Sequence, residues 1–194
     1  MPSIVIHEEV AVYLSSIIHC DSYEYYLGVL APDAPNINGF AEKEERWMAH
    51  VRRKNLQEWR NSLYNFYLLE KNNYPKDFLI GYIIHILTDI IYDDFLYLKV
   101  REEIEKKGIS REESHNIMRE DMKKYHFEKE DYWKDILKTS NTSFSIQNIS
   151  KEELLEWKEK QLLEETSKSQ FITKEVIEEL NRLVRQELLE RYQI

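Results

Sequence analysis

The sequence predicts an all-α protein of about six or seven helices. Apolar residues recur at helical spacing through most of the 194 residues, and no alternating strand pattern extends beyond a few positions. The chain has only four glycines and four prolines, whereas sandwiches and barrels need many turns. This length suits one domain. We expect a helical core at residues 1–137, with amphipathic helices at residues 150–194 packed on it in the same domain.

The first 108 residues are expected to contain three helices and one loop. Residues 5–20 and 41–72 carry apolar stripes at helical spacing. Residues 25–40 hold two of the four glycines and two of the four prolines, so they are predicted to be the main irregular loop. A third helix, at residues 77–107, starts shortly after a proline and is expected to end at Gly108.

Four further helices complete the prediction. Two of them begin at a capping box, in which a serine is followed three residues later by a glutamate: Ser110 with Glu113, and Ser150 with Glu153. The expected ranges are 110–124, 128–137, 150–167 and, capped by Thr173, 174–192, with a Ser/Thr/Asn-rich break at 138–149.

Charge and cysteine content limit the cellular setting. With 27 Lys and Arg against 36 Asp and Glu, the net charge is −9, which does not favour a nucleic acid or an anionic membrane as partner. One cysteine, Cys20, excludes an intrachain disulfide and fits a reducing compartment. No signal peptide is visible, and the most apolar stretch, residues 78–100, contains charged residues that make a transmembrane segment improbable. We therefore expect a cytoplasmic protein.

The third predicted helix carries an unusual polar stripe. Gly81, His85, Asp89 and Asp93 follow one another at intervals of four, so they share one face of an otherwise apolar helix. A buried carboxylate is costly unless it is paired or bound to metal, and His85 and Asp89 can both reach one divalent ion. Gly81 leaves room for another chain or a ligand. The alternative is a buried His–Asp hydrogen bond with structural value only.

Three more residues are candidate ligands, although each alone has an ordinary explanation. His7 opens the first helix near its apolar face, which suits core packing. Asp33 lies between two prolines, where an aspartate usually caps a turn. His50 lies in the second predicted helix, where it suits the surface or the core.

The order and spacing of these residues resemble the zinc-dependent phospholipase C family, which is related to the zinc-dependent single-strand nucleases. The resemblance spans residues 1–100: His7, then YYLGVLAPD with Asp33, then His50, then GYIIHILTD with His85 and Asp89. The G-x-x-A-P-D and G-Y-x-x-H-x-x-x-D segments are its most specific parts.

The resemblance implies an all-helical fold with two or three zinc ions in a cleft. Carried over by position, His50, His85, Asp33 and Asp89 hold one zinc, and His7 and Asp89 contribute to a second, with Asp89 bridging. Asp33 would also orient or deprotonate a metal-bound water, which gives it the catalytic role. Because His/Asp sets accept several ions, manganese and iron remain alternatives to zinc.

A third metal site is less well supported. The family has a His-x-x-x-Glu pair and an additional histidine, and here His126 with Glu130 has that spacing, with His115 upstream. No histidine follows soon after Asp89; the sequence offers Asp93 and Asp94 instead. The alternative for His115 and His126 is a solvated helix face.

The sequence therefore predicts a metal-dependent hydrolase of a phosphate ester, acting on a small phosphate-containing or lipid-like substrate. The alternative is a non-catalytic helical protein with a structural metal site or a partner-binding role. A helical phosphohydrolase of the HD type would need an adjacent His-Asp pair, and the sequence has none. The C-terminal amphipathic helices either cover the core or form a homodimer contact.

Overall fold

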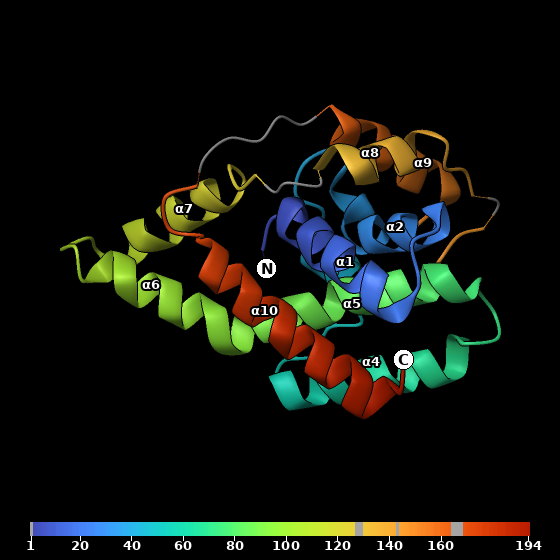
Figure 1. The fold of residues 1–194 in the computed structure, drawn as a ribbon, viewed down its shortest axis with the longest axis horizontal. Helices are drawn as coiled ribbons and strands as arrows, with labels where there is room; N and C mark the ends of the chain where they lie inside the picture. The colour runs from blue at the N-terminus through green and yellow to red at the C-terminus, as the bar shows by residue number, and fades with distance from the viewer. Residues whose placement is uncertain (1, 127–129, 143, 164–168) are drawn as a thin grey trace.

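A long, almost wholly apolar helix, α5 (Lys76–Ile91), runs through the middle of the molecule in the computed structural model (Figure 1). Every residue of α5 from Phe78 to Ile91 is buried. The helix continues through a π-helical turn, η2 (Tyr92–Leu96), into α6 (Tyr97–Glu105), as the sequence predicted for this region. The structure describes residues 2–126, 130–142, 144–163 and 169–194.

The fold is all-α, as predicted. Apart from an isolated bridge between Ile146 and Ile149, the described residues form only helices and loops. In this part of the chain, no helix has the length and apolar character needed to cross a membrane. The remaining elements are α1 (Ile4–Ile18), α2 (Tyr23–Leu30), the 3-10 helix η1 (Ala31–Asn36), α3 (Lys43–Ala49), α4 (Leu56–Glu70), α7 (Arg111–Met122), α8 (Glu130–Lys138), α9 (Lys151–Leu162), α10 (Lys174–Glu187) and the π-helical turn η3 (Leu188–Tyr192).

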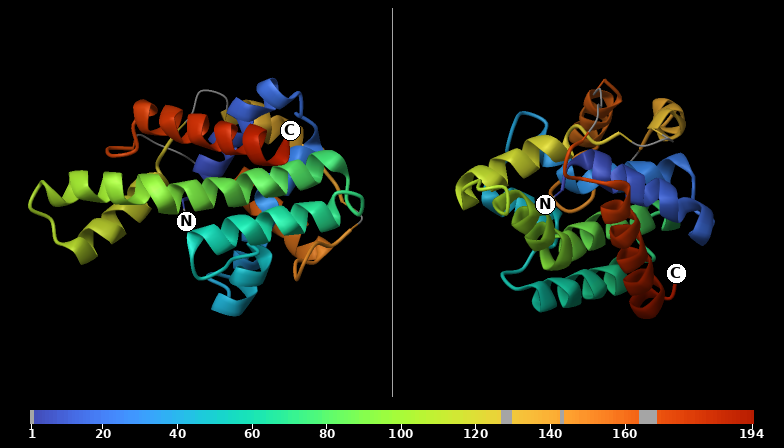
Figure 2. Two further views of the ribbon diagram at one scale, coloured as in Figure 1. Left: turned by 90° about the horizontal axis from the view of Figure 1, so that it is seen from below. Right: turned by 60° about the vertical axis from the view of Figure 1, so that its left-hand side comes forward.

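Helices from both halves of the chain cover α5. Helices α1, α2, α4 and α10 all contact it, and α10 and α4 lie on either side of the continuous α5–α6 run (Figure 2, left). Helices α8 and α9 pack on α2, while α6 and α7 form a hairpin that projects from one end of the molecule (Figures 1 and 2).

Two predictions about the first half of the chain were wrong. Most of residues 25–40 is helical rather than irregular. Gly28 lies where α2 packs against the backbone of α5, and Pro32 lies at the start of η1, where a missing N–H is tolerated. The predicted helix at 41–72 is two helices, α3 and α4, separated where Val51 adopts a φ of 50°. The predicted number of helices was therefore too low.

Three of the four predicted helix starts in the second half agree with the structure, and the fourth, at residue 128, lies outside the described residues. Ser150 and Glu153 form a complete capping box, and the Ser110 side chain accepts from the Glu113 N–H. Thr173 is the N-cap of α10, although its side chain makes no capping hydrogen bond. Parts of the helices predicted at 128–137 and 150–167 lie outside the described residues.

Two glycines bring α2 and α5 into backbone contact. A Cβ atom on Gly81 would lie 2.0 Å from the carbonyl oxygen of Tyr25, and one on Gly28 would lie 2.1 Å from that of Phe78. Real Cβ atoms do not approach backbone so closely, so any side chain here would push the helices apart. The sequence predicted that Gly81 leaves room for another chain or a ligand, and the space is filled by α2 of the same chain.

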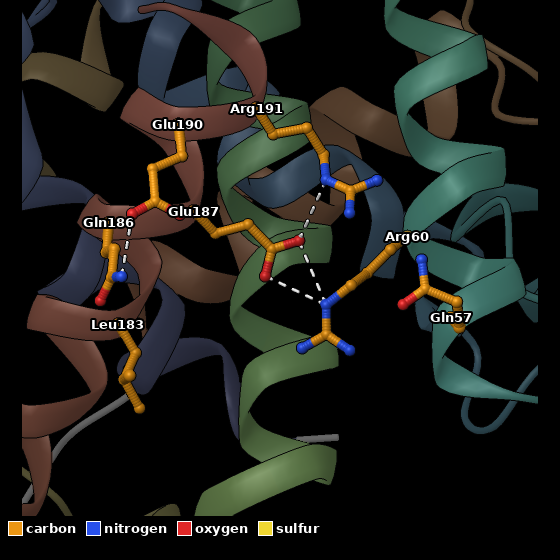
Figure 3. Close-up of a pocket in the computed structure, with 7 residues that line it drawn as sticks. All are labelled: Gln57, Arg60, Leu183, Gln186, Glu187, Glu190 and Arg191. Atoms are coloured by element: carbon orange, nitrogen blue, oxygen red, sulfur yellow. Dashed lines mark hydrogen bonds and ion pairs between the residues drawn. The ribbon is translucent and has the colours of Figure 1, made fainter.

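An ion-pair network fastens α10 to α4 beside an open groove of about 610 Å³ (Figure 3). The Arg60 guanidinium on α4 donates to Glu187 on α10 at 3.1 Å and to Asp94 on η2 at 2.9 Å. Arg191 approaches the same Glu187 carboxylate at 3.7 Å. The network therefore joins three elements that are distant in the sequence.

A single carboxylate anchors the segment that leads into α10. The Asp121 side chain, at the end of α7, accepts hydrogen bonds from the Ser169 hydroxyl at 2.6 Å and from the backbone N–H groups of Gln170, Phe171 and Ile172 at 2.7, 2.7 and 3.2 Å. Burial alone would raise the pKa of Asp121, but these hydrogen bonds lower it below its usual value.

The substitution Gly81→Ala should test the backbone contact. An alanine in a helix interior ordinarily stabilises by about 0.5–1 kcal/mol relative to glycine. Here we expect a loss of about 3 kcal/mol, the upper end of the usual cost of overpacking, because the new methyl group meets backbone atoms that cannot move aside. Urea unfolding measures the change. Gly39→Ala is the control, because a Cβ there meets nothing within 4 Å and only its φ of 110° is strained, at a cost of about 1 kcal/mol. An equal loss for both variants would contradict the contact.

The substitution Asp121→Asn should destabilise the protein by about 1–3 kcal/mol at pH 7, because one acceptor oxygen of a charged carboxylate is lost. The folded-state pKa is lowered, so the carboxylate stabilises the fold above the unfolded pKa of about 3.9 and this contribution is lost as the pH falls through the folded pKa. Urea unfolding should therefore show wild type and variant converging below pH 4. The exposed Asp135→Asn on α8 is the control, and a pH-independent difference for Asp121→Asn would contradict the linkage.

Candidate metal centre

The five predicted metal ligands come together in the interior. His7 lies on α1, Asp33 on η1 and His50 at the end of α3, while His85 and Asp89 lie one turn apart on α5. They form two overlapping groups, His7–His85–Asp89 and Asp33–His50–His85, and within each group the donor atoms lie within 4.8 Å of one another.

The distances between donor atoms suit a small divalent ion. Ligand atoms that surround zinc tetrahedrally at about 2.0–2.2 Å lie about 3.3–3.6 Å from one another. His50 Nε2 is 3.4 Å from Asp33 Oδ1 and 3.5 Å from Asp89 Oδ2. His7 Nε2 is 3.5 Å from Asp89 Oδ1. His85 Nε2 is slightly farther from its partners, at 3.9 Å from Asp89 and 4.0 Å from Asp33.

Backbone carbonyls orient two of the histidines. His85 Nδ1 lies 2.6 Å from the Val29 carbonyl oxygen, and His50 Nδ1 lies 2.8 Å from that of Arg46. A carbonyl only accepts, so Nδ1 carries the proton and Nε2 of the neutral ring presents a lone pair to the site. This arrangement is typical of metal-binding histidines. The His7 ring stacks on His85, with centroids 3.7 Å apart and planes 4° from parallel.

The atoms that face the centre lack hydrogen-bond partners. Nε2 of His7, His50 and His85 and both carboxylate oxygens of Asp89 are buried and make no hydrogen bond to any residue that the structure describes. Buried polar atoms are normally satisfied, since each orphan costs about 1–3 kcal/mol. Bound divalent cations would satisfy these atoms, so the donor set fits a metal of the zinc type.

Burial keeps two of the imidazole rings, those of His7 and His85, in the neutral form that can bind a metal. It lowers the pKa of His7 and His85 well below their usual value, and neighbouring imidazoles lower it further. Burial raises the pKa of Asp89 to about 7. For His50, burial is outweighed by the carboxylates of Asp33 and Asp89, which raise its pKa. The pKa of Asp33 is lowered despite burial, because His50 and His85 lie beside its carboxylate.

One donor reaches a cleft that opens to solvent. The Asp33 side chain is 13% exposed, whereas those of the other four candidates are at most 1% exposed. Asp33 lines a cleft of about 580 Å³, whose walls include residues of α7 and α9. We call it the α7–α9 cleft. Tyr92 also lines it, and its buried hydroxyl has no hydrogen-bond partner among the described residues. A ligand that approaches the donors from this cleft meets Asp33.

The predicted third metal site is not assembled by the described residues. His115 Nδ1 lies 3.1 Å from the Tyr97 hydroxyl, and His115 belongs to neither donor group. His126 is exposed, as expected for a solvated position, and the side chain of Glu130 lies outside the described part of the structure.

The two aspartates that follow Asp89 have cationic partners instead. Asp93 pairs with Arg52 at 2.9 Å, and Asp94 pairs with Arg60 at 2.9 Å. The π-helical turn that carries both aspartates changes the register of the helix after α5. The i+4 spacing from Asp89 to Asp93 therefore does not extend the polar stripe into the site.

The walls of the cleft were not predicted from the sequence. Tyr92, Arg46, Trp157, Lys160 and Gln161 all line it. Trp157, Lys160 and Gln161 have the i, i+3, i+4 spacing of one helix face, which is a usable signal, but the sequence assigned that helix to covering the core.

Comparisons with protein-family models, with curated proteins and with solved structures found no match for the chain.

Zinc should stabilise the protein through the donor set. At a free concentration about 100 times the dissociation constant, binding contributes about 2.7 kcal/mol, or about 5–10 °C in melting temperature for a chain of this size. The double substitution His85→Ala, Asp89→Ala should abolish the shift and the bound zinc measured by mass spectrometry. His19→Ala, an exposed histidine at the end of α1, is the control. An unchanged shift in the double variant would exclude these residues as ligands.

Proposed function

We propose that this protein is a metal-dependent hydrolase of a phosphate ester, similar to the zinc-dependent phospholipases C. The observation that carries the proposal is the set of buried, unsatisfied donor atoms that meets a cleft at Asp33. Structural metal sites are closed by protein ligands, whereas catalytic sites keep one side open to substrate. The 13% exposure of Asp33 supplies that open side.

The donor geometry supports two ions rather than one. Asp89 Oδ1 faces His7, whereas Oδ2 faces His50, so its two oxygens point to different histidines, as a bridging carboxylate requires. His50, His85, Asp33 and Asp89 would hold one zinc, and His7 with Asp89 would contribute to the second. Such ions polarise a phosphoryl oxygen and lower the pKa of a bound water toward 7.

Asp33 is the residue placed to handle the proton of the attacking water. Its lowered pKa keeps it a carboxylate at neutral pH, and Asn36 Nδ2 lies 3.3 Å from its Oδ1 and orients it. The water oxygen bonds to phosphorus, the water proton passes to the Asp33 carboxylate, and the bond from phosphorus to the leaving oxygen breaks. The leaving oxygen then takes up the proton and departs as an alcohol.

Tyr92 is placed to hold the phosphate. Tyr92 lines the cleft, and its buried hydroxyl has no hydrogen-bond partner among the described residues. Burial raises the pKa of Tyr92 far above neutrality, so the phenol stays a neutral hydrogen-bond donor. Such a donor suits a phosphoryl oxygen in a protein whose net charge of −9 would otherwise repel phosphate.

A non-catalytic metal protein is the second candidate. The observation in its favour is that four of the five candidate ligands have side chains at most 1% exposed, as in a closed structural site. Under this alternative, zinc would raise the melting temperature without any turnover.

The substitution Asp33→Asn tests the hydrolase. We expect the zinc-loaded chain to hydrolyse bis(4-nitrophenyl) phosphate, and we expect kcat to fall by about 10²–10⁴ in the variant, since a positioned proton acceptor is lost. Release of 4-nitrophenolate gives the rate, and mass spectrometry gives the zinc content of each protein. Asp94→Asn, an aspartate beyond the donor set, is the matched control. Zinc binding without hydrolysis of any phosphodiester in a broad panel would exclude the enzyme and leave the structural site.

A further inference from the structure

Two cations at the α7–α9 cleft have no carboxylate partner among the described residues. Arg46 Nε donates to the Ala41 carbonyl at 3.0 Å, and Lys160 Nζ donates to the Ile37 carbonyl at 3.2 Å. Arg119 and Lys123, on the other wall, both approach Glu120. The residues that line the cleft thus include four cations and a single carboxylate, Asp33, in a chain with a net charge of −9.

One face of α9 presents polar groups to the same cleft. Trp157 and Gln161 are one helical turn apart, and α9 packs against η1, which carries Asp33. Gln161 is only 2% exposed, and neither its amide nitrogen nor its amide oxygen has a hydrogen-bond partner in the described part of the chain. The same holds for the indole N–H of Trp157, which is 8% exposed.

Unpartnered buried groups at the wall of a cleft point to a ligand. A buried amide without partners is energetically costly, and a bound molecule that supplies the missing partners removes this cost. The amide of Gln161 offers both a donor and an acceptor, which matches hydroxyl groups. Arg46 and Lys160 supply positive charge beside it.

We propose that Arg46, Trp157, Lys160 and Gln161 form a head-group subsite that selects phosphate esters whose head group carries a second negative charge and hydroxyl groups. This inference rests on the proposed hydrolase, because Asp33 and the head-group subsite line the same cleft. The second anion pairs with Arg46 and Lys160, while the hydroxyl groups bond to Gln161 and Trp157. A cationic head group would meet like charge.

Calorimetric titration of the zinc-loaded chain tests the head-group subsite without turnover. The probes are phosphate monoesters: myo-inositol 1,4-bisphosphate, myo-inositol 1-phosphate and phosphocholine. We expect the bisphosphate to bind at least about tenfold more tightly than phosphocholine, with the monophosphate between them. Lys160→Gln, Arg46→Gln and Gln161→Leu should each reduce this preference about three- to tenfold. Trp157→Phe, which removes the indole N–H but keeps an aromatic ring, should reduce it as well.

The control is Lys151→Gln, which removes a lysine at the start of the same helix but outside the cleft. If Lys151→Gln weakens binding of the bisphosphate as much as Lys160→Gln does, general charge attraction explains the preference and the proposal of a head-group subsite is wrong. Equal binding of the bisphosphate and phosphocholine by the wild-type chain would overturn it as well. An unchanged zinc-induced melting shift in each variant shows that the fold and the donors are intact.

Hydrolysis assays separate this inference from the proposed function. A preference for the bisphosphate without hydrolysis of any diester would keep the head-group subsite and exclude the hydrolase. Hydrolysis of glycerophosphocholine and glycerophosphoinositol 4-phosphate at equal kcat/KM would keep the hydrolase and exclude the head-group subsite. Faster hydrolysis of glycerophosphoinositol 4-phosphate than of glycerophosphocholine supports both the hydrolase and the head-group subsite. Comparison with dihexanoyl phosphatidylinositol 4-phosphate then shows whether the head group belongs to a lipid or to a water-soluble ester.

Discussion

The backbone contact between α2 and α5 is the constraint on which the interior depends. Because Gly28 and Gly81 carry no side chains, the two helices approach until the Val29 carbonyl reaches His85 Nδ1. That hydrogen bond turns His85 Nε2 toward the other donors. The chain then passes directly from α2 into η1, which places Asp33 opposite His50. One close helix crossing thus sets the position of donors from separate parts of the chain.

The sequence singled out His85 and Asp89 as candidate donors because their chemistry conflicts with their apolar helix, whereas His7, Asp33 and His50 became candidates only through the order and spacing of the motifs. A histidine and an aspartate four residues apart in an apolar helix need an explanation, whereas residues of a solvated helix face do not. The predicted helices at 5–20 and 77–107 were correct because apolar residues recur at helical spacing along each of them. The start of α9 could be predicted from its capping box, which is a local sequence signal.

Other features depend on contacts between distant residues and were therefore hidden. Gly28 and Pro32 suggested a loop, but the glycine is a tertiary contact and the proline begins a 3-10 helix. The break between α3 and α4 positions His50, yet the apolar stripe continues across it and conceals it. The cleft could not be predicted from the sequence, because α7 and α9 lie far from Asp33 along the chain and come together with it only in the folded structure.

The candidate donors and the wall of the cleft come from different parts of the chain, which affects how this protein can diverge in evolution. All five candidate donors precede residue 90, whereas α7 and α9, which supply much of the cleft wall, come after residue 110. The Asp121 anchor further ties α7 to the segment before α10, so the wall depends on the C-terminal third of the chain. Substitutions there can reshape the cleft while the buried candidate donors stay in place, so the shape of the cleft and the donor set can change independently within one domain.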